Sequence, residues 1–210
     1  MCTTTRRRAV IGLGNVGPQF KFTPHNIGFA ALEALANEHA TFFQAGRMNN
    51  AMVAELTFPS NGSDVVLVMP STGMNDSGDA LAELLDECDF DISDILVIFD
   101  DLSFDWGCMR IKTAGRASSS AGHNGVASLL QHVPEARLLT ALKLGVGPNP
   151  DGADRKSYVL NPVSLDRLGL YQAVASEAGR CIEQWLERDL IALMNRYNAK
   201  NFVVKESDFN

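Results

Sequence analysis

The sequence predicts a single-domain α/β protein, an α/β/α sandwich around a mixed, largely parallel central sheet. Short apolar runs of strand length alternate with longer stretches of helical periodicity, as expected for strand–helix–strand units. The 210 residues suffice for one well-buried domain and do not require two. No apolar run reaches the roughly 18 residues that a membrane-spanning helix needs, so we expect no membrane partner.

Runs rich in β-branched and aromatic residues, bounded by turn residues, predict the strands. These are Ala9–Leu13, Met52–Phe58, Val65–Met69, Ile95–Phe99, Cys108–Lys112 and Ala141–Val146. Apolar residues at helical spacing predict the helices. These are Asn26–Glu38, Ser77–Glu87, Asn124–His132, Leu165–Glu187 and Leu190–Asn195. Residues 1–7 are expected to be a flexible basic N-terminus and 203–210 a flexible tail, so the domain spans 8–202; the Gly-, Ala- and Ser-rich stretch 113–122 predicts a mobile loop.

The first predicted strand, Ala9–Leu13, runs into a G-x-G-x-x-G pattern at Gly12–Gly17, which is typical of a dinucleotide-binding turn. That turn holds a pyrophosphate only where a helix opens at the third glycine. Here Pro18 and Pro24 follow, and the residue before a proline disfavours helical backbone. The helical pattern starts only near Asn26. The segment therefore predicts strand, loop and then helix, with no nucleotide cofactor, and argues against a nicotinamide-dependent oxidoreductase.

The charge balance is acidic, with 18 Lys and Arg against 25 Asp and Glu and a formal net charge of −7. This argues against a protein that binds nucleic acid over its whole surface. A local basic face remains compatible with it, and an ordinary solvated surface is the alternative. The cationic residues in question are Arg110, Lys112, Arg116, Arg137 and Lys143.

The four cysteines lie far apart with no C-x-x-C pair. They predict reduced thiols in a cytoplasm-like compartment, without a disulfide framework or a zinc site. The first residues, MCTTTRRR, are basic and hydroxyl-rich but short, so a mitochondrial destination stays open beside the cytoplasm.

Five polar residues follow strands or open helices at the edge where ligands lie in an open α/β sheet. They are Asn15, His25, Asn75, Asp100 and Asn124. Taken singly, each has an ordinary structural interpretation: Asn75 and Asn124 as helix N-caps, Asp100 and Asn15 as turn residues, and His25 as a capping or packing residue. Their convergence on one edge favours a site.

The chemistry that these residues suit is hydrolysis of an acyl bond. A histidine bonded to a carboxylate is a general base, and Asn side chains can bind peptide groups or a developing oxyanion. No G-x-S-x-G elbow is present, so water is the simplest nucleophile. One histidine, one well-placed aspartate and neutral amides make a poor transition-metal site, so we expect no metal.

With these residues in view, the sequence resembles the bacterial-type peptidyl-tRNA hydrolases over residues 8–197. The matching blocks are Gly12–Gly28, Pro70–Gly78, Ile95–Leu102, Gly122–Gly125, Leu142–Gly147, Cys181–Trp185 and Met194–Arg196. Several blocks in order are more specific than any single motif. The resemblance implies cleavage of the ester between a peptide and the 3′-terminal ribose of tRNA, by a monomer without metal or cofactor.

The resemblance also implies roles for individual residues. His25 would activate water, and Asp100 would orient the His25 ring and stabilise its charge. Asn124 would position the water or the carbonyl oxygen. Asn15 and Asn75 would hold the peptide part of the substrate, and the substrate would also contact Phe20, Met74 and His123. The tRNA phosphates would contact Arg110, Lys112 and Lys143. A local clamp of this kind predicts salt-sensitive binding of tRNA to an acidic protein.

The sequence departs from the family pattern at several positions. Phe20 replaces a usual tyrosine, Phe99 stands where histidine is frequent, and Ser103 replaces a usual aspartate. Lys143 replaces a common arginine, which turns a bidentate phosphate contact into a point-charge contact. The loop before His123 is longer and rich in serine. The main alternative to the enzyme is a relative that binds RNA in RNA processing without hydrolysis, although such a binder needs no His–Asp pair.

Overall fold

The computed structural model describes residues 7–58, 63–87, 90–113, 122–149, 153–187 and 190–209. Within them, six strands form one sheet in the order β2-β3-β1-β4-β6-β5. The strands are β1 Arg8–Gly12, β2 Ala51–Phe58, β3 Ser63–Pro70, β4 Ile95–Asp105, β5 Met109–Lys112 and β6 Thr140–Gly147. The central pairs β3–β1, β1–β4 and β4–β6 are parallel, whereas β2 and β5 pair antiparallel at the two edges. The prediction of a mixed, largely parallel sheet is confirmed.

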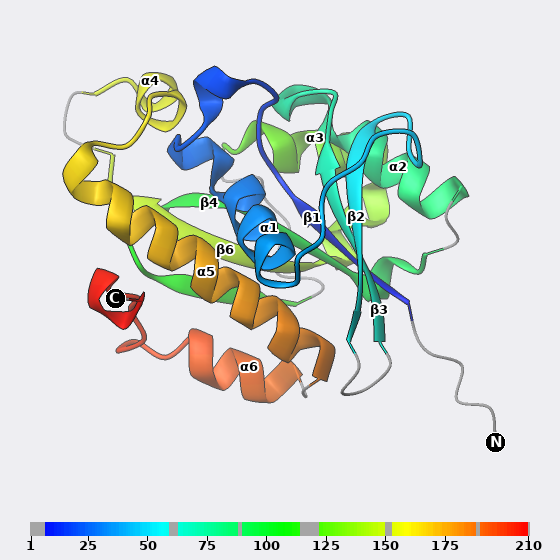
Figure 1. Ribbon diagram of the computed structural model, residues 1–210. Helices are drawn as coiled ribbons and strands as arrows, with labels where there is room; N and C mark the ends of the chain where they lie inside the picture. Colours follow the sequence, from blue (N-terminus) through cyan, green and yellow to red (C-terminus); the bar gives the residue numbers. More distant parts are fainter. Residues whose placement is uncertain are drawn as a thin grey trace.

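Helices cover both faces of this sheet (Figure 1). They are α1 Ile27–Glu38, α2 Ser77–Glu87, α3 Asn124–His132, α4 Arg155–Leu160, α5 Leu165–Glu187 and α6 Leu190–Tyr197. One core cluster packs α1, α5 and α6 against the sheet, and a second packs α2 and α3 against the opposite face. The predicted α/β/α sandwich is therefore confirmed. Among the described residues, no helix has the combined length and apolarity that crossing a membrane requires.

The helix α4 is absent from the sequence prediction. It has only six residues, of which Val159 alone is buried, so it carries too little apolar periodicity to be recognised. Its one sequence signal is Asp154, whose carboxylate accepts a hydrogen bond from the backbone N–H of Ser157 at 2.7 Å. Strand β4 also continues to Asp105, well past the predicted end at Phe99.

The glycines of the first block serve packing between backbone segments. A Cβ placed on Gly12 would lie 2.5 Å from the carbonyl oxygen of Gly28. A Cβ on Gly28 would lie 2.6 Å from the carbonyl oxygens of Leu13 and Ile98. The start of α1 thus touches the backbone at the end of β1 and within β4 directly, which only glycine permits. The helix begins at Ile27, after the prolines, as the sequence predicted.

The C-terminal segment differs from the expected flexible tail. Val204 is only 4% exposed, and its N–H donates to the carbonyl of Gly107 at 2.9 Å. The 3₁₀ turn Glu206–Phe209 then packs against α5. One buried valine docks this segment, and a single apolar residue has no periodicity that a sequence analysis can detect. At the other end, Arg7 is bonded to Glu55 at 2.9 Å, and residues 1–6 lie outside the described residues.

Candidate active site

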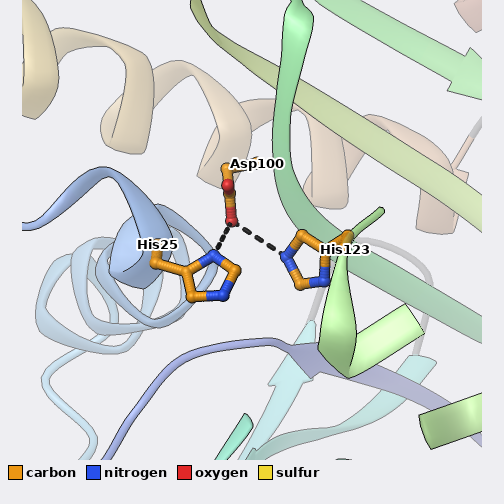
Figure 2. A group of neighbouring side chains, drawn as sticks. All are labelled: His25, Asp100 and His123. Carbon is orange, nitrogen blue, oxygen red and sulfur yellow. Dashed lines mark hydrogen bonds and ion pairs between the residues drawn. The ribbon is translucent and has the colours of Figure 1, made fainter. Parts of the chain in front are cut away.

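Three side chains from distant parts of the chain meet at the carboxyl end of the sheet (Figure 2). His25 lies in the 3₁₀ turn before α1, Asp100 lies in β4, and His123 is the N-cap residue of α3. The Nδ1 atom of His25 is 2.8 Å from Oδ1 of Asp100, and the Nε2 atom of His123 is 2.9 Å from the same oxygen. All three residues are buried, each at 9% exposure or less. The predicted His25–Asp100 pair therefore exists, with a second histidine added to it.

The local sequence sets the position of His25. Pro24 opens the 3₁₀ turn, and Thr23 before it has extended backbone, as a residue before proline prefers. The Thr23 hydroxyl donates to the carbonyl of Phe20 at 2.8 Å, which closes the preceding loop. His25 is therefore held just ahead of α1 by a rigid turn.

Asn26 is a structural residue of the site that the sequence analysis missed. Its Oδ1 accepts from the N–H of Asn15 at 2.9 Å, and its Nδ2 donates to the carbonyl of Asn15 at 2.8 Å. The Asn26 side chain thereby fixes the loop after β1. This role could not be predicted from the sequence, because an asparagine at this position is equally typical of the start of a helix.

The hydrogen bonds fix the tautomer of both rings. His123 Nδ1 accepts from the backbone N–H of Val126 at 3.3 Å, so its Nε2 carries the proton that is donated to Asp100. His25 donates from Nδ1, and a neutral ring protonated there has its lone pair on Nε2. The arrangement makes Nε2 of His25 the basic atom of the site.

Asp100 is held ionised by its neighbours. Burial raises the pKa of this carboxyl, but the charges and hydrogen bonds of His123 and His25 outweigh the burial and hold the pKa well below its ordinary value. Asp100 therefore stays an anion that accepts from both rings at any pH near neutrality.

This ionisation couples to stability. The pKa of Asp100 in the folded protein lies below its unfolded value of about 3.9. The stabilisation that ionised Asp100 gives the folded state is therefore complete above about pH 4, and it is lost as the pH falls toward the folded pKa. We expect the free energy of unfolding to decrease below about pH 4, and Asp100→Asn to make that decrease shallower. Urea unfolding at a series of pH values measures both slopes. Equal acid slopes in the two proteins would contradict this.

The three residues line a pocket of about 370 Å³. All five polar residues that the sequence predicted to converge border it, together with Met74. The full lining is Asn15, His25, Met74, Asn75, Asp100, Leu102, Gly122, His123, Asn124, Asp154, Arg155, Lys156, Val159 and Leu160. Asn75 and Asn124 are exposed, so their amides are accessible to a ligand. Asn15 is partly exposed, and its Oδ1 accepts from the N–H of Met74 at 3.3 Å.

The alternative interpretation of the two asparagines as helix N-caps is wrong. Asn124 is the first residue of α3, and His123 before it provides the cap. Asn75 lies inside the 3₁₀ turn Met74–Asp76 and precedes α2 by two residues. Phe20, predicted to contact the substrate, does not border this pocket. His123, predicted as a substrate contact, borders the pocket and donates a hydrogen bond to Asp100.

Two of the residues that depart from the family pattern, Phe99 and Ser103, contact His123 and Asp101, respectively. Phe99 packs its ring edge-on against His123, with centroids 5.2 Å apart. The backbone N–H of Ser103 donates to Oδ1 of Asp101 at 2.8 Å. The serine-rich loop 113–122 falls almost wholly outside the described residues.

The three predicted phosphate-binding residues share one face of the sheet at its β6–β5 end. Arg110 pairs with Lys143 across the strands, and Lys112 is two residues along β5 on the same face. Lys143 bonds Oδ2 of Asp101 at 2.9 Å and lies over the ring of Phe99. Arg110 donates to two backbone carbonyls, those of Met109 and Tyr197. Arg116 and the side chain of Arg137 lie outside what the structure describes.

Asn198 fixes the strand that carries these charges. Its Oδ1 accepts from the N–H of Ile111 at 2.7 Å, and its Nδ2 donates to the carbonyl of Ile111 at 2.9 Å. The amide side chain thereby completes the open edge of β5, between Arg110 and Lys112.

The donor set of the site also bears on metal binding. The sequence argument against a metal assumed one histidine in the site, but the structure adds His123. The possible ligand atoms of His25, Asp100 and His123 all lie within 4.8 Å of one another. Two imidazoles and a carboxylate suit several divalent transition metals. Here both ring N–H groups donate to the carboxylate, so a metal would have to replace those hydrogen bonds. An assay of this site should therefore include a metal chelator such as EDTA.

Comparison with known proteins identifies the family. Residues 9–205 match the family described as peptidyl-tRNA hydrolase. A peptidyl-tRNA hydrolase of Exiguobacterium sp. is 38% identical over 191 residues, covering 91% of this chain and 100% of that protein. One from Koribacter versatilis is 34% identical, covering 92% and 93%. The crystal structure of the Acinetobacter baumannii peptidyl-tRNA hydrolase shares the fold, with a TM-score of 0.82 at 24% identity over 96% of this chain and 97% of that one. This chain belongs to the peptidyl-tRNA hydrolase family.

Proposed function

We propose that this chain hydrolyses the ester bond between peptide and tRNA in peptidyl-tRNA, with water activated by His25. The observation that carries the proposal is the 2.8 Å contact between His25 and an ionised Asp100, at the wall of a pocket bordered by three asparagines. It is supported by membership of the family.

The His25 tautomer that is protonated on Nδ1 determines which atom acts as the base in the reaction. Nε2 of His25 takes a proton from water, and the water oxygen forms a bond to the ester carbonyl carbon. The imidazolium that forms is stabilised by Asp100. When the tetrahedral intermediate collapses, the bond to the ribose oxygen breaks and that oxygen takes the proton from His25. The products are free tRNA and a peptide with a free carboxyl group.

The amides supply the remaining interactions. Asn124, exposed beside His123, would donate to the carbonyl oxygen as negative charge develops on it, or position the water. Asn15 and Asn75 would bind peptide groups, since an amide side chain both donates and accepts, and Met74 borders the same pocket. These assignments explain why a peptide, rather than a free amino acid, is the preferred acyl group.

The RNA part of the substrate would lie over the basic face of β5 and β6. Lys112, Arg110 and Lys143 would contact phosphates there. Because peptidyl-tRNA is formed where translation takes place, the proposed activity would belong in the cytoplasm or in an organelle that translates, and the chain would act as a monomer.

Release of a labelled N-acetyl-amino acid from N-acetyl-aminoacyl-tRNA, in the presence of EDTA, tests the function. The same tRNA with an unblocked amino acid is the control. We expect hydrolysis of the blocked substrate only. Activity abolished by EDTA would replace the mechanism with a metal-dependent one at His25, Asp100 and His123. Binding of tRNA without hydrolysis would favour the RNA-binding alternative.

Lys112→Ala is expected to weaken tRNA binding several-fold and to reduce the slope of log affinity against log salt by about 1. The reason is the loss of one phosphate contact and its released counterion. Arg47→Ala is the matched control, because Arg47 pairs with Glu55 of β2 at the opposite edge of the sheet. Filter binding from low to moderate salt measures both. An unchanged slope in Lys112→Ala would remove this residue from the RNA contact.

A further inference from the structure

A second pocket, of about 350 Å³, lies beside the catalytic one. Both pockets are bordered by Asn15. We propose that this second pocket binds an apolar side chain of the peptide, from one of the two residues upstream of the esterified one. The proposal rests on the function proposed above and assigns a specificity site to it.

The lining is mainly apolar and partly open to solvent. It includes Phe22, Phe29, Met69 and the buried ring of Tyr171. Two further lining residues are among the large apolar side chains that the described surface exposes, namely Val16 at 53% and Met52 at 38%. Exposed apolar side chains gathered around a pocket mark a binding site for an apolar group.

The wall between the two pockets is rigid. Asn26, which borders the second pocket, makes both side-chain hydrogen bonds to the backbone of Asn15. Phe22 packs edge-on against Tyr171, with ring centroids 6.1 Å apart, and its carbonyl accepts from the N–H of Val163 at 2.9 Å. A pocket held in this way is pre-organised, so little ordering cost opposes binding of a side chain.

The order of strands identifies the peptide as the occupant rather than the RNA. The basic residues lie on β5 and β6, and the catalytic cluster takes Asp100 from β4. The second pocket takes Met52 from β2 and Met69 from β3, on the other side of the cluster. A substrate with its phosphates at β5–β6 and its ester at Asp100 directs its peptide toward β3 and β2.

Chain geometry agrees with this direction. An extended peptide advances about 3.3 Å per residue and alternates its side chains. With the ester carbonyl at His25 and the first peptide group at Asn15, one of the next two side chains reaches past Asn15 into the second pocket. The charged residues of its lining, Lys21 and Glu33, are of opposite sign and give no excess of positive charge to favour a phosphate.

The test uses N-acetylated di- and tripeptidyl-tRNAs that carry either Leu or Gly at the second or third residue from the ester, beside N-acetyl-aminoacyl-tRNA. In the unaltered chain we expect kcat/KM to be about three- to tenfold higher with Leu than with Gly at one of these positions, because part of the leucine side chain is buried. Ala30→Phe, which fills the pocket from α1, should abolish this preference and leave the one-residue substrate within about twofold.

Two further variants keep the test decisive. Ala34→Phe makes the same change one turn along α1 at a residue outside the lining, and it should preserve the leucine preference. Met52→Asp places a charge at an exposed position of the apolar rim, which folding tolerates, and it should reduce the preference as Ala30→Phe does.

Equal rates for Leu and Gly in the unaltered chain would overturn the proposal, and so would a preference that survives both pocket variants. Loss of the one-residue substrate in step with the longer ones would also overturn it, since the pocket would then not act on upstream residues. Hydrolysis of N-acetyl-aminoacyl-tRNA by the unaltered chain separates failure of this site from failure of the proposed function, because only the latter removes that activity.

Discussion

Replacing His25 by alanine is expected to lower kcat for N-acetyl-aminoacyl-tRNA by about 10²–10⁴-fold, with little change in tRNA affinity. The variant loses the ring that borders the pocket and whose Nδ1 donates to Asp100, which leaves the basic lone pair on Nε2. The RNA contacts proposed for β5 and β6 are untouched. Single-turnover hydrolysis and filter binding, made on the same preparations, separate the two quantities.

His39→Ala is the control for this experiment. His39 is bonded to Glu183 at 2.7 Å, between α1 and α5, and lies outside the catalytic pocket. It should retain full activity. If His25→Ala kept more than about a tenth of the original kcat, general-base catalysis by this ring would be excluded.

Gly28→Ala is expected to destabilise the fold by about 1–3 kcal/mol. The new methyl group would lie 2.6 Å from two backbone carbonyl oxygens, those of Leu13 just after β1 and Ile98 within β4, which cannot move as a flexible side chain does. Relief requires α1 to move away from the sheet. That movement also displaces His25 from Asp100, so activity should fall together with the melting temperature.

The matched control is Gly179→Ala in α5. Its added methyl group would meet Leu35 at 3.5 Å, an ordinary contact, and alanine favours helix over glycine by up to about 1 kcal/mol. We expect neutral or raised stability by thermal unfolding. A Gly28→Ala variant as stable as Gly179→Ala would show that the close approach of α1 to the strands is absent.

Much of the fold could be predicted because its strands and long helices carry clear periodicity. The predicted strands Ala9–Leu13, Val65–Met69 and Ile95–Phe99 are apolar throughout, and α1, α3 and α5 begin within one residue of their predicted starts. The elements that could not be predicted are those fixed by few contacts. Helix α4 buries one residue, and the C-terminal segment is docked through Val204.

The residues of the site could be predicted from the sequence, but the hydrogen bonds between them could not. Strand ends and helix starts place Asn15, His25 and Asp100 at one edge, because the carboxyl ends of parallel strands coincide. The sharing of one Asp100 oxygen by two rings depends on the exact approach of α3 to β4, which spacing along the chain does not encode. The same holds for Asn26 and Asn198, whose amide side chains bond to backbone groups of other segments.

The central claim is that His25 and Asp100 act as one catalytic unit, and a double-mutant cycle on kcat tests it most directly. The proteins are His25→Ala, Asp100→Asn and the double variant, assayed with N-acetyl-aminoacyl-tRNA in EDTA. If Asp100 acts through His25, the double variant should lose no more than about threefold beyond His25→Ala alone. A double variant whose loss equals the product of the two single losses would contradict the account, because the two residues would then act independently.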